Sequence, residues 1–346
     1  MKTNKVYSGS CLEVLKTFPD ESIDTCITSP PYWGLRDYGT EGQIWGGDSD
    51  CEHDFTSSTR KLHSGSWGEK DNALPHQKNA TILNWEVEDK TCGKCGAWKG
   101  ELGLEPTPEM FISNLCDIFD EIKRVLRPHG SCWVNLGDSY CRNPNSQDQT
   151  GKTGIKTMKY NYNFKHKKKF GSVYKAKSLV QIPSRFSIEM TNRGWILRNE
   201  IIWHKPSCLP ASVKDRYTVD FEKMFFFTKN PKYYFKQQLE DTVDSLKRNK
   251  RTVWHINTAT FKDAHFAVYP PDLLESPIDA CCPNDGVVLD PFFGSGTTAQ
   301  VAMSQDKDWV GIELNPEYEK ISEKRLKPKI IEKKTRDKAN EFWNTK

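Results

Sequence analysis

A glycine-rich segment near the C-terminus, Asp290 to Thr298 (DPFFGSGTT), joins an acidic side chain to a backbone that can approach a ligand closely. Gly294 and Gly296 follow a predicted apolar strand, Val287 to Leu289, at its carboxyl end, where α/β folds bind ligands. No lysine follows the last glycine, which disfavours a phosphate-binding P-loop, and the third glycine of a dinucleotide fingerprint is missing. The segment predicts a ligand-binding loop, although a tight turn in any Rossmann-like domain would also explain it.

A second motif, Thr28 to Trp33 (TSPPYW), places a hydroxyl group, two prolines and aromatic rings at the end of another predicted apolar strand, Ile23 to Thr28. Proline cannot continue a β ladder, so the chain must turn at the double proline. The prolines therefore fix in advance how Ser29 and Tyr32 are presented. A chance turn of the same sequence is the alternative.

Four side chains in a polar stretch have the types and spacing of zinc ligands, as a C-x-H and a C-x-x-C half-site. A closed, four-coordinate structural Zn²⁺ would hold together a segment with little apolar core of its own. His63 or His76 could replace the histidine of the first half-site, and two unrelated clusters in a loop are the alternative. The predicted ligands are Cys51, His53, Cys92 and Cys95.

Basic residues gather in one stretch, although the formal net charge of the whole chain is only +4. From Cys141 to Ser178, ten Lys or Arg side chains stand against the single acid Asp148, and five aromatic residues are interleaved with them. Such a mixture can neutralise phosphates and stack on bases. A solvated lysine-rich loop without function is the alternative. We expect phosphate contacts from Lys165, Lys167, Lys168 and Lys169, and from Arg216.

These motifs must be positioned by the elements around them. Strand, loop and helix patterns at 286–301 and 309–326 predict the units of a doubly wound sheet. We also predict a helix over 110–125, strands over 131–136 and 199–203, a hairpin of 223–228 with 233–235, and polar insertions at 39–105, 140–178 and 230–262.

Together the two loops resemble those of S-adenosylmethionine-dependent DNA amino-methyltransferases, DPFFGSGTT their cofactor loop and TSPPYW their catalytic loop. The catalytic motif comes first in the chain, which resembles the β class with its permuted Rossmann-like fold. Further matches are VLRPHGSCWVNLGD at 125–138, IIWHKP at 201–206 and HFAVYP at 265–270. The resemblance covers most of the chain outside the insertions. It implies an α/β fold with a mixed, mostly parallel, doubly wound sheet and large insertions.

The resemblance implies a catalytic role for Ser29, Pro30, Pro31 and Tyr32. An exocyclic base amine is a poor nucleophile because its lone pair is delocalised into the ring. Ser29 Oγ and the Pro30 carbonyl would accept its two hydrogens and favour a more tetrahedral nitrogen, while Tyr32 would stack on a flipped base. Alignment of nitrogen, methyl and sulfur would then supply much of the acceleration, without a covalent intermediate.

The resemblance also implies where S-adenosyl-L-methionine binds. Glu313, at the end of the strand after the cofactor helix, would accept hydrogen bonds from the ribose hydroxyls. The turn after the first strand reads Gly9-Ser10 where related enzymes often have Gly-Asp, so an acidic contact to the adenine is not expected there. The other implied cofactor residues are Asp290, Phe292, Gly294, Ser295, Gly296 and Thr297, with His265 and Phe266 nearby.

On this basis we divide the chain into a methyltransferase domain and its insertions. The methyltransferase domain comprises 1–38 with the catalytic motif, 106–139, 179–229 and 264–330 with the cofactor motif. The remaining parts are 39–105 with the zinc site, 140–178 as a basic DNA-contacting loop, 230–263 as a target-recognition segment, and 331–346 as a charged C-terminal tail.

The function expected from the resemblance is site-specific methylation of duplex DNA with base flipping. Serine before Pro-Pro-Tyr favours the N4 nitrogen of cytosine over the N6 nitrogen of adenine. RNA or protein amide methylation is the nearest enzymatic alternative, and an inactive, zinc-containing DNA-binding protein is an alternative of another class. A homodimer and a cognate restriction endonuclease both remain open.

Composition indicates the cellular compartment. Mean hydropathy is −0.72, and no apolar stretch approaches the roughly 18–20 residues of a membrane helix. The N-terminus lacks a signal-peptide core, so the eleven cysteines are expected to be reduced. We therefore expect no membrane partner and a cytoplasmic location in a bacterial, archaeal or phage-infected cell.

Overall fold

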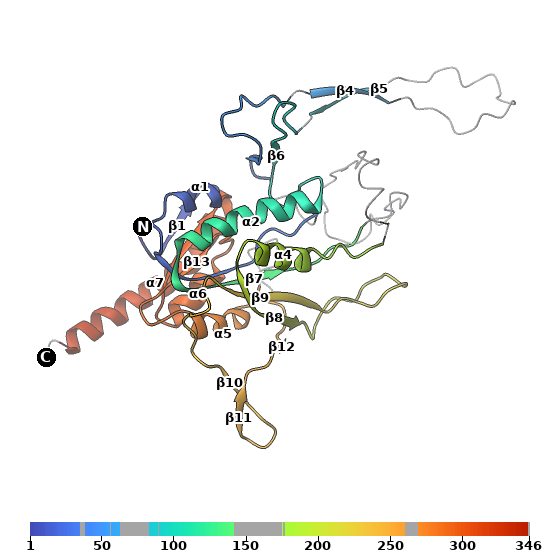
Figure 1. Cartoon of the computed structure of the whole chain (residues 1–346). Helices are drawn as coiled ribbons and strands as arrows, with labels where there is room; N and C mark the ends of the chain where they lie inside the picture. The colour runs from blue at the N-terminus through green and yellow to red at the C-terminus, as the bar shows by residue number, and fades with distance from the viewer. Residues whose placement is uncertain are drawn as a thin grey trace, which may run out of the picture. The chain divides into compact units, whose positions relative to one another are not determined.

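The chain folds as two units, Met1–Thr40 with Leu102–Lys346 (the main unit) and Glu41–Glu101 (the 41–101 unit). The computed structural model describes residues 1–34, 39–55, 57–62, 83–88, 90–141, 175, 177–259 and 269–344, with the backbone alone for 57–62, 83–88 and 332–344 (Figure 1). Among the described residues, none of the helices combines the length and apolar character that crossing a membrane requires.

A mixed sheet forms the centre of the main unit, with eight strands among the described residues. All neighbouring pairs are parallel except those of β9, which runs antiparallel to both β7 and β8. The predicted mixed, mostly parallel sheet of a Rossmann-like fold is confirmed. In spatial order the strands are β1 (Lys5–Ser8), β14 (Asp308–Glu313), β13 (Val287–Asp290), β2 (Ile23–Thr28), β7 (Leu126–Leu136), β9 (Phe221–Thr228), β8 (Ile196–His204) and β12 (Val253–His255).

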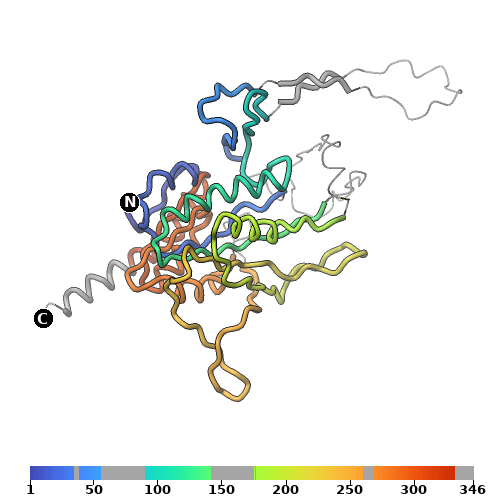
Figure 2. The backbone as a smooth tube through the Cα atoms, in the orientation of Figure 1, coloured from blue at the N-terminus to red at the C-terminus, as the bar shows by residue number. Residues whose placement is uncertain are grey.

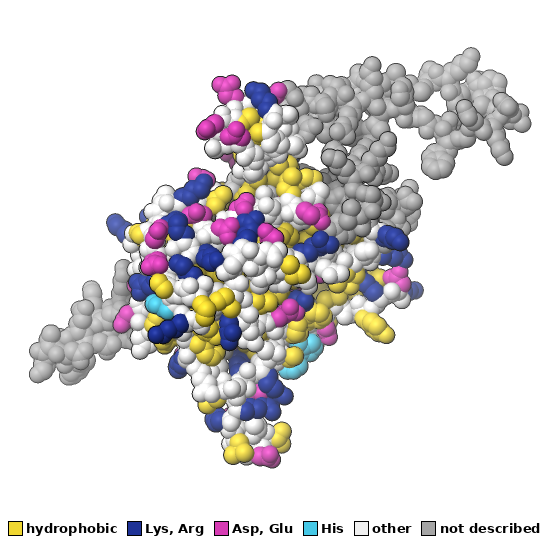
Figure 3. Space-filling view, viewed as in Figure 1, with side chains coloured by type: hydrophobic (Ala, Val, Ile, Leu, Met, Phe, Trp, Pro, Cys, Tyr) yellow, Lys and Arg dark blue, Asp and Glu magenta, His cyan; other side chains and the backbone are white. Residues whose placement is uncertain are grey.

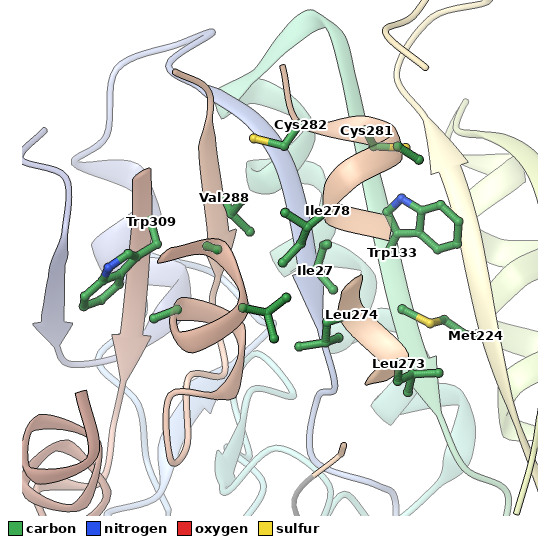
Figure 4. Packing of buried hydrophobic residues seen from close by; sticks show 14 of the residues in the cluster. Ile27, Trp133, Met224, Leu273, Leu274, Ile278, Cys281, Cys282, Val288 and Trp309 are labelled. Atoms are coloured by element: carbon green, nitrogen blue, oxygen red, sulfur yellow. The ribbon is translucent and has the colours of Figure 1, made fainter. Parts of the chain in front are cut away.

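Helices cover both faces of this sheet, because its central strands carry apolar residues on both sides. On one face, α5 (Asp272–Cys281), α6 (Thr297–Ser304) and α7 (Pro316–Asn344) contribute to one buried cluster with the strands. Figure 4 shows Leu273, Leu274 and Ile278 of α5 beside Ile27, Trp133 and Met224 of the strands.

The other face carries α1 (Cys11–Lys16), α2 (Pro108–Val125) and α4 (Ile182–Asn192). Strand β9 packs side chains on both faces of the sheet. Phe226 belongs to the first cluster, whereas Phe225 and Phe227 lie against Phe186 of α4, with ring centroids 6.2 and 6.1 Å from that of Phe186. The start of α2 is fixed by Thr107, whose side chain accepts from the amide of Met110 at 3.2 Å.

Three sequence expectations about the elements were wrong in part. Residues 233–235 form no hairpin strand, because β9 finds its partners in β7 and β8. Segment 230–262, expected to lie outside the sheet, supplies the edge strand β12 and a separate ribbon of β10 (Leu239–Asp241) and β11 (Lys247–Asn249). Helix α7 runs on to Asn344 instead of ending near Leu326, since its Lys- and Glu-rich sequence favours helix.

The 41–101 unit is built from two short antiparallel ribbons. Strand β3 (Gln43–Trp45) pairs with β6 (Trp98–Gly100), and β4 (Ser57–Leu62) pairs with β5 (Leu83–Glu88). Trp45 Nε1 donates to the Gly100 carbonyl at 2.9 Å and so closes the first ribbon. Figure 2 traces the backbone of this unit, with 41–55 in blue and 90–101 in teal.

Candidate active site

Two adjacent parallel strands bring the predicted catalytic and cofactor loops together. Strand β2 pairs with β13, with Thr25 opposite Val288 and Cys26 opposite Leu289, so both strands end at the same edge of the sheet. At that edge Thr28 Oγ1 donates a hydrogen bond of 2.7 Å to Asp290 Oδ1, between residues 262 positions apart. The loops that follow the two strands therefore start side by side.

Asp290 is the buried hub of this edge. Its Oδ1 accepts from Thr28 and from the amide of Phe292 (3.1 Å), and its Oδ2 accepts from Tyr269 OH (2.9 Å) and Thr298 Oγ1 (2.5 Å). Burial raises the pKa of Asp290 to about 6, although these hydrogen bonds oppose the shift. A carboxylate offers about four acceptor directions, and all are used within the protein. Asp290 therefore orders the two loops rather than offering an acceptor to a ligand.

Glu313, at the end of β14, holds the glycine loop from the other side. Its Oε2 accepts from the amide of Gly294 at 2.7 Å, and its Oε1 accepts from the amide of Asn315 at 2.8 Å. Burial raises its pKa above the ordinary value of a glutamate. The amide of Leu314 also donates to this carboxylate, so at least one of its about four acceptor directions remains for a ligand hydroxyl.

We call the half-buried Phe292 and Gly294 the outward half of the glycine loop, and the buried Phe293, Ser295 and Thr297 its inward half. Phe292 and Gly294 are half-buried, whereas Phe293 is buried with its ring stacked on Trp309, centroids 5.3 Å apart. Gly294 (φ +52°) and Gly296 (φ +80°) adopt the left-handed region, which explains why the motif needs glycine there.

Arg325 of α7 is a site residue that the sequence analysis missed. Its Nη1 donates to Ser295 Oγ at 2.8 Å, to the Ser295 carbonyl at 3.2 Å and to Thr297 Oγ1 at 2.9 Å. The hydroxyls of Ser295 and Thr297, expected near the cofactor, are thus engaged by the protein. Nothing in the local sequence marks an arginine 28 positions after the loop as its partner.

On the catalytic side, Tyr32 is held by residues from β7 and β9. Its hydroxyl lies 3.0 Å from Asn135 Oδ1 and 2.7 Å from Glu222 Oε2, and Lys205 forms an ion pair with the other oxygen of Glu222. Ser29 Oγ is 3.4 Å from the Tyr32 hydroxyl. These contacts place the amino end of β9 at the same edge as the carboxyl ends of its neighbours.

Several of these partners stand in sequence motifs noted above but without an assigned role. Asn135 lies in VNLGD, Lys205 in IIWHKP, and only Glu222 had no sequence signal. Gly137 belongs to the same group, because a Cβ at this position would lie 2.5 Å from Tyr32 Cε2. The ring of Tyr32 therefore packs directly on the backbone after β7.

Other expected site residues have different outcomes. His265, Phe266, Lys165, Lys167, Lys168 and Lys169 lie outside the described residues, as do His63 and His76. Arg216 is described, and its guanidinium lies 3.4 Å from the centroid of the Tyr140 ring. In the 41–101 unit, the ligand atoms of Cys51, His53, Cys92 and Cys95 all lie within 4.8 Å of one another.

Comparison with known proteins decides the family. The N6/N4 DNA methylase family model matches residues 23–324, which include both loops and the whole core of the sheet between them. The chain belongs to the N6/N4 DNA methylase family.

Members of this family with similar sequences are type II methyltransferases. M.Cfr9I of Citrobacter freundii is 34% identical over 93% of this chain and 87% of its own length. M.SmaI of Serratia marcescens is 33% identical over 94% of this chain and 91% of its own length.

Solved structures share the fold. The PvuII DNA methyltransferase, described as cytosine-N4-specific, superposes with a TM-score of 0.55 at 18% identity, covering 93% of this chain and 86% of its own. A putative DNA modification methylase of Thermus thermophilus, TTHA0409, in complex with S-adenosyl-L-methionine, gives a TM-score of 0.52 at 20% identity, covering 94% of this chain and 95% of its own.

Proposed function

We propose that this DNA methylase transfers a methyl group from S-adenosyl-L-methionine to the exocyclic amino nitrogen of a base flipped out of duplex DNA, with cytosine N4 as the favoured acceptor. The observation that carries the proposal is the hydrogen bond between Thr28 and Asp290, which joins the start of the SPPY loop to the start of the glycine loop. A methyl donor on one loop then faces an amine held by the other.

The outward half of the glycine loop fits the cofactor. Glu313 keeps an acceptor direction for a ribose hydroxyl, Gly294 leaves room at the loop surface, and half-buried Phe292 offers an apolar face. Bound S-adenosyl-L-methionine would supply an activated methyl group on sulfur. The residues of this chain then have to hold and align the acceptor nitrogen.

Ser29 and the Pro30 carbonyl are the acceptors proposed for the two amine hydrogens. The ring of Tyr32 is the proposed stacking surface, held by Gly137 below it and by Asn135 and Glu222 at its hydroxyl. Rigid support of this kind lowers the cost of alignment, because the acceptors need not reorganise when the base enters.

The preference for cytosine N4 rests on serine at position 29, and it is in keeping with the name of the PvuII enzyme that shares the fold. Adenine N6 is the competing acceptor of the same chemistry. The type II relatives favour a role in a restriction-modification system of a bacterial cell, next to a cognate endonuclease.

DNA contact is assigned to the basic 140–178 stretch and to segment 230–263. Strand β11 in the second segment carries Lys247 and Arg248, and Lys250 and Arg251 follow directly after it. Figure 3 shows basic side chains on this protruding part of the chain. Phosphate contacts would supply affinity, while base edges supply sequence choice.

The test is direct. The purified chain is incubated with labelled cofactor and mixed duplex DNA, the DNA is digested to nucleosides, and the methylated nucleoside is identified by mass. N4-methylcytosine is expected; N6-methyladenine would reverse the base preference. Absence of both in protein that binds cofactor would refute the methylation. As a control for the site, Tyr32→Ala should lower turnover much more than it lowers cofactor affinity.

A further inference from the structure

Four ligand-type atoms converge in the 41–101 unit, and none of them belongs to a residue of the proposed methyl-transfer site. Cys51 Sγ lies 4.0 Å from Cys92 Sγ, and Cys95 Sγ lies 3.3 Å from His53 Nδ1. A tetrahedral zinc site with Zn–S bonds of about 2.3 Å and a Zn–N bond of about 2.0 Å puts neighbouring ligand atoms roughly 3.5–3.8 Å apart. A disulfide requires about 2.05 Å between sulfurs, so the observed spacing suits a shared cation and not a bonded pair.

The backbone around the cluster is shaped to receive metal-bound thiolates. The amide of Asp54 donates to Cys92 Sγ at 3.3 Å, and the amides of Lys94 and Cys95 donate to the same sulfur. At Gly47 (φ +76°) an added Cβ would lie 2.8 Å from Cys95 Sγ, so the chain passes close to this sulfur. Such N–H donors are the outer contacts that hold ligands around a metal.

The described side chains of the 41–101 unit, at 41–55 and 90–101, form only a small apolar core around the cluster. Its buried apolar residues, among those that the structure describes, are Trp45, Cys92, Ala97 and Trp98. A small apolar core of this kind is commonly reinforced by disulfides or a bound metal. Cysteine pairing is absent, because all three cluster cysteines are free thiols.

We propose that Cys51, Cys92 and Cys95 through Sγ, and His53 through Nδ1, bind one Zn²⁺ in a closed tetrahedral site whose role is to hold the 41–101 unit in its fold. The ligand set leaves no open position for water or substrate, so the metal is structural. Among the described residues of this unit, His53 is the histidine that completes the cluster.

Metal content tests the site without any measurement of methylation. The full-length chain, purified without added metal or chelator, should contain one zinc per chain by elemental mass spectrometry. Cys95→Ser and His53→Ala should each weaken zinc binding at least about tenfold. The matched control Cys208→Ser changes a half-buried cysteine of the main unit and should keep one zinc per chain.

A second measurement protects the test against misfolded variants. His53→Cys preserves four ligands and should retain the metal, and Co²⁺ exchanged into the wild-type chain should show the absorption bands of a tetrahedral thiolate site. Stripping zinc from the wild type with a chelator should speed tryptic cleavage at Lys94 and Lys99, while cleavage within the sheet strands of the main unit stays unchanged. The proposal would be overturned if the chain, as purified, contained no zinc and its cluster thiols reacted at once with a thiol reagent or were joined as a disulfide.

Discussion

The ring of Tyr32 rests on Gly137, where any added Cβ would come within 2.5 Å of Tyr32 Cε2. Gly137→Ala should therefore displace the ring and lower methyl-transfer turnover by at least about tenfold, with little change in cofactor affinity. A displaced ring would no longer hold the acceptor nitrogen in line with the methyl group. Stopped-flow turnover and equilibrium cofactor binding measure the two effects.

The double variant provides the control for this claim. If the glycine acts only through the ring, Gly137→Ala should add almost nothing to the loss already caused by Tyr32→Ala. Additive losses would mean that Gly137 acts on something else.

Asp290 makes stability depend on pH. Its pKa is about 6 in the folded chain and near its ordinary 3.8 when unfolded, so the folded state holds more protons between these values. The free energy of unfolding should thus fall as pH rises from about 4 to about 6, by roughly 2–3 kcal/mol, and stay at the lower value above. Asp290→Asn removes this contribution, and with it the part of the upward pKa shift of Glu313 that the Asp290 charge causes. Urea unfolding of both proteins at about pH 4.5 and about pH 7 measures it, and identical pH dependence in the two would contradict the assignment.

Arg325 should contribute to cofactor binding, although it lies 28 positions after Thr297 in the sequence. Arg325→Ala removes the donor that serves Ser295 and Thr297, so the inward half of the glycine loop loses its support. We expect a roughly tenfold rise in the dissociation constant for the cofactor, with a stability loss of about 1–3 kcal/mol. Lys327→Ala, an exposed change on the same helix, is the matched control. Equal binding by both variants would remove Arg325 from the site.

Substitutions of Glu222 can separate two roles of its carboxylate, as acceptor for the Tyr32 hydroxyl and as ion-pair partner of Lys205. Glu222→Gln keeps an acceptor for the Tyr32 hydroxyl, so turnover should drop only about two- to fivefold. Both variants leave Lys205 without its ion pair, but Glu222→Ala also removes the acceptor, so a loss above about tenfold is expected. Steady-state kinetics with saturating cofactor distinguish the variants. A glutamine variant as impaired as alanine would show that the charge matters rather than the hydrogen bond.

The loops could be predicted because proline and glycine restrict or free the backbone locally. The prolines after Thr28 and the left-handed Gly296 leave their mark on the sequence wherever the rest of the chain lies. Glu313 was placed for a similar reason, as an acid at the end of an apolar strand.

The missed residues depend on distant partners. Arg325 and Glu222 meet the loops only through the packing of α7 and β9, and neither has a local pattern that distinguishes it from a surface charge. Strand β12 was missed because three residues, with one buried, carry no readable alternation. Its pairing with β8 decides its conformation instead.

Because β2 pairs with β13, the sheet edge that carries the site can form only late in synthesis. Synthesis proceeds from the N-terminus, so Thr28, at the start of the SPPY loop, emerges 262 residues before Asp290, to which it donates its hydrogen bond. A nascent chain can carry every proposed catalytic residue and still have no neighbour for one side of β2. Methylating capacity should therefore arise abruptly, only when translation is nearly finished, and a chain cut short before Val287 should have none.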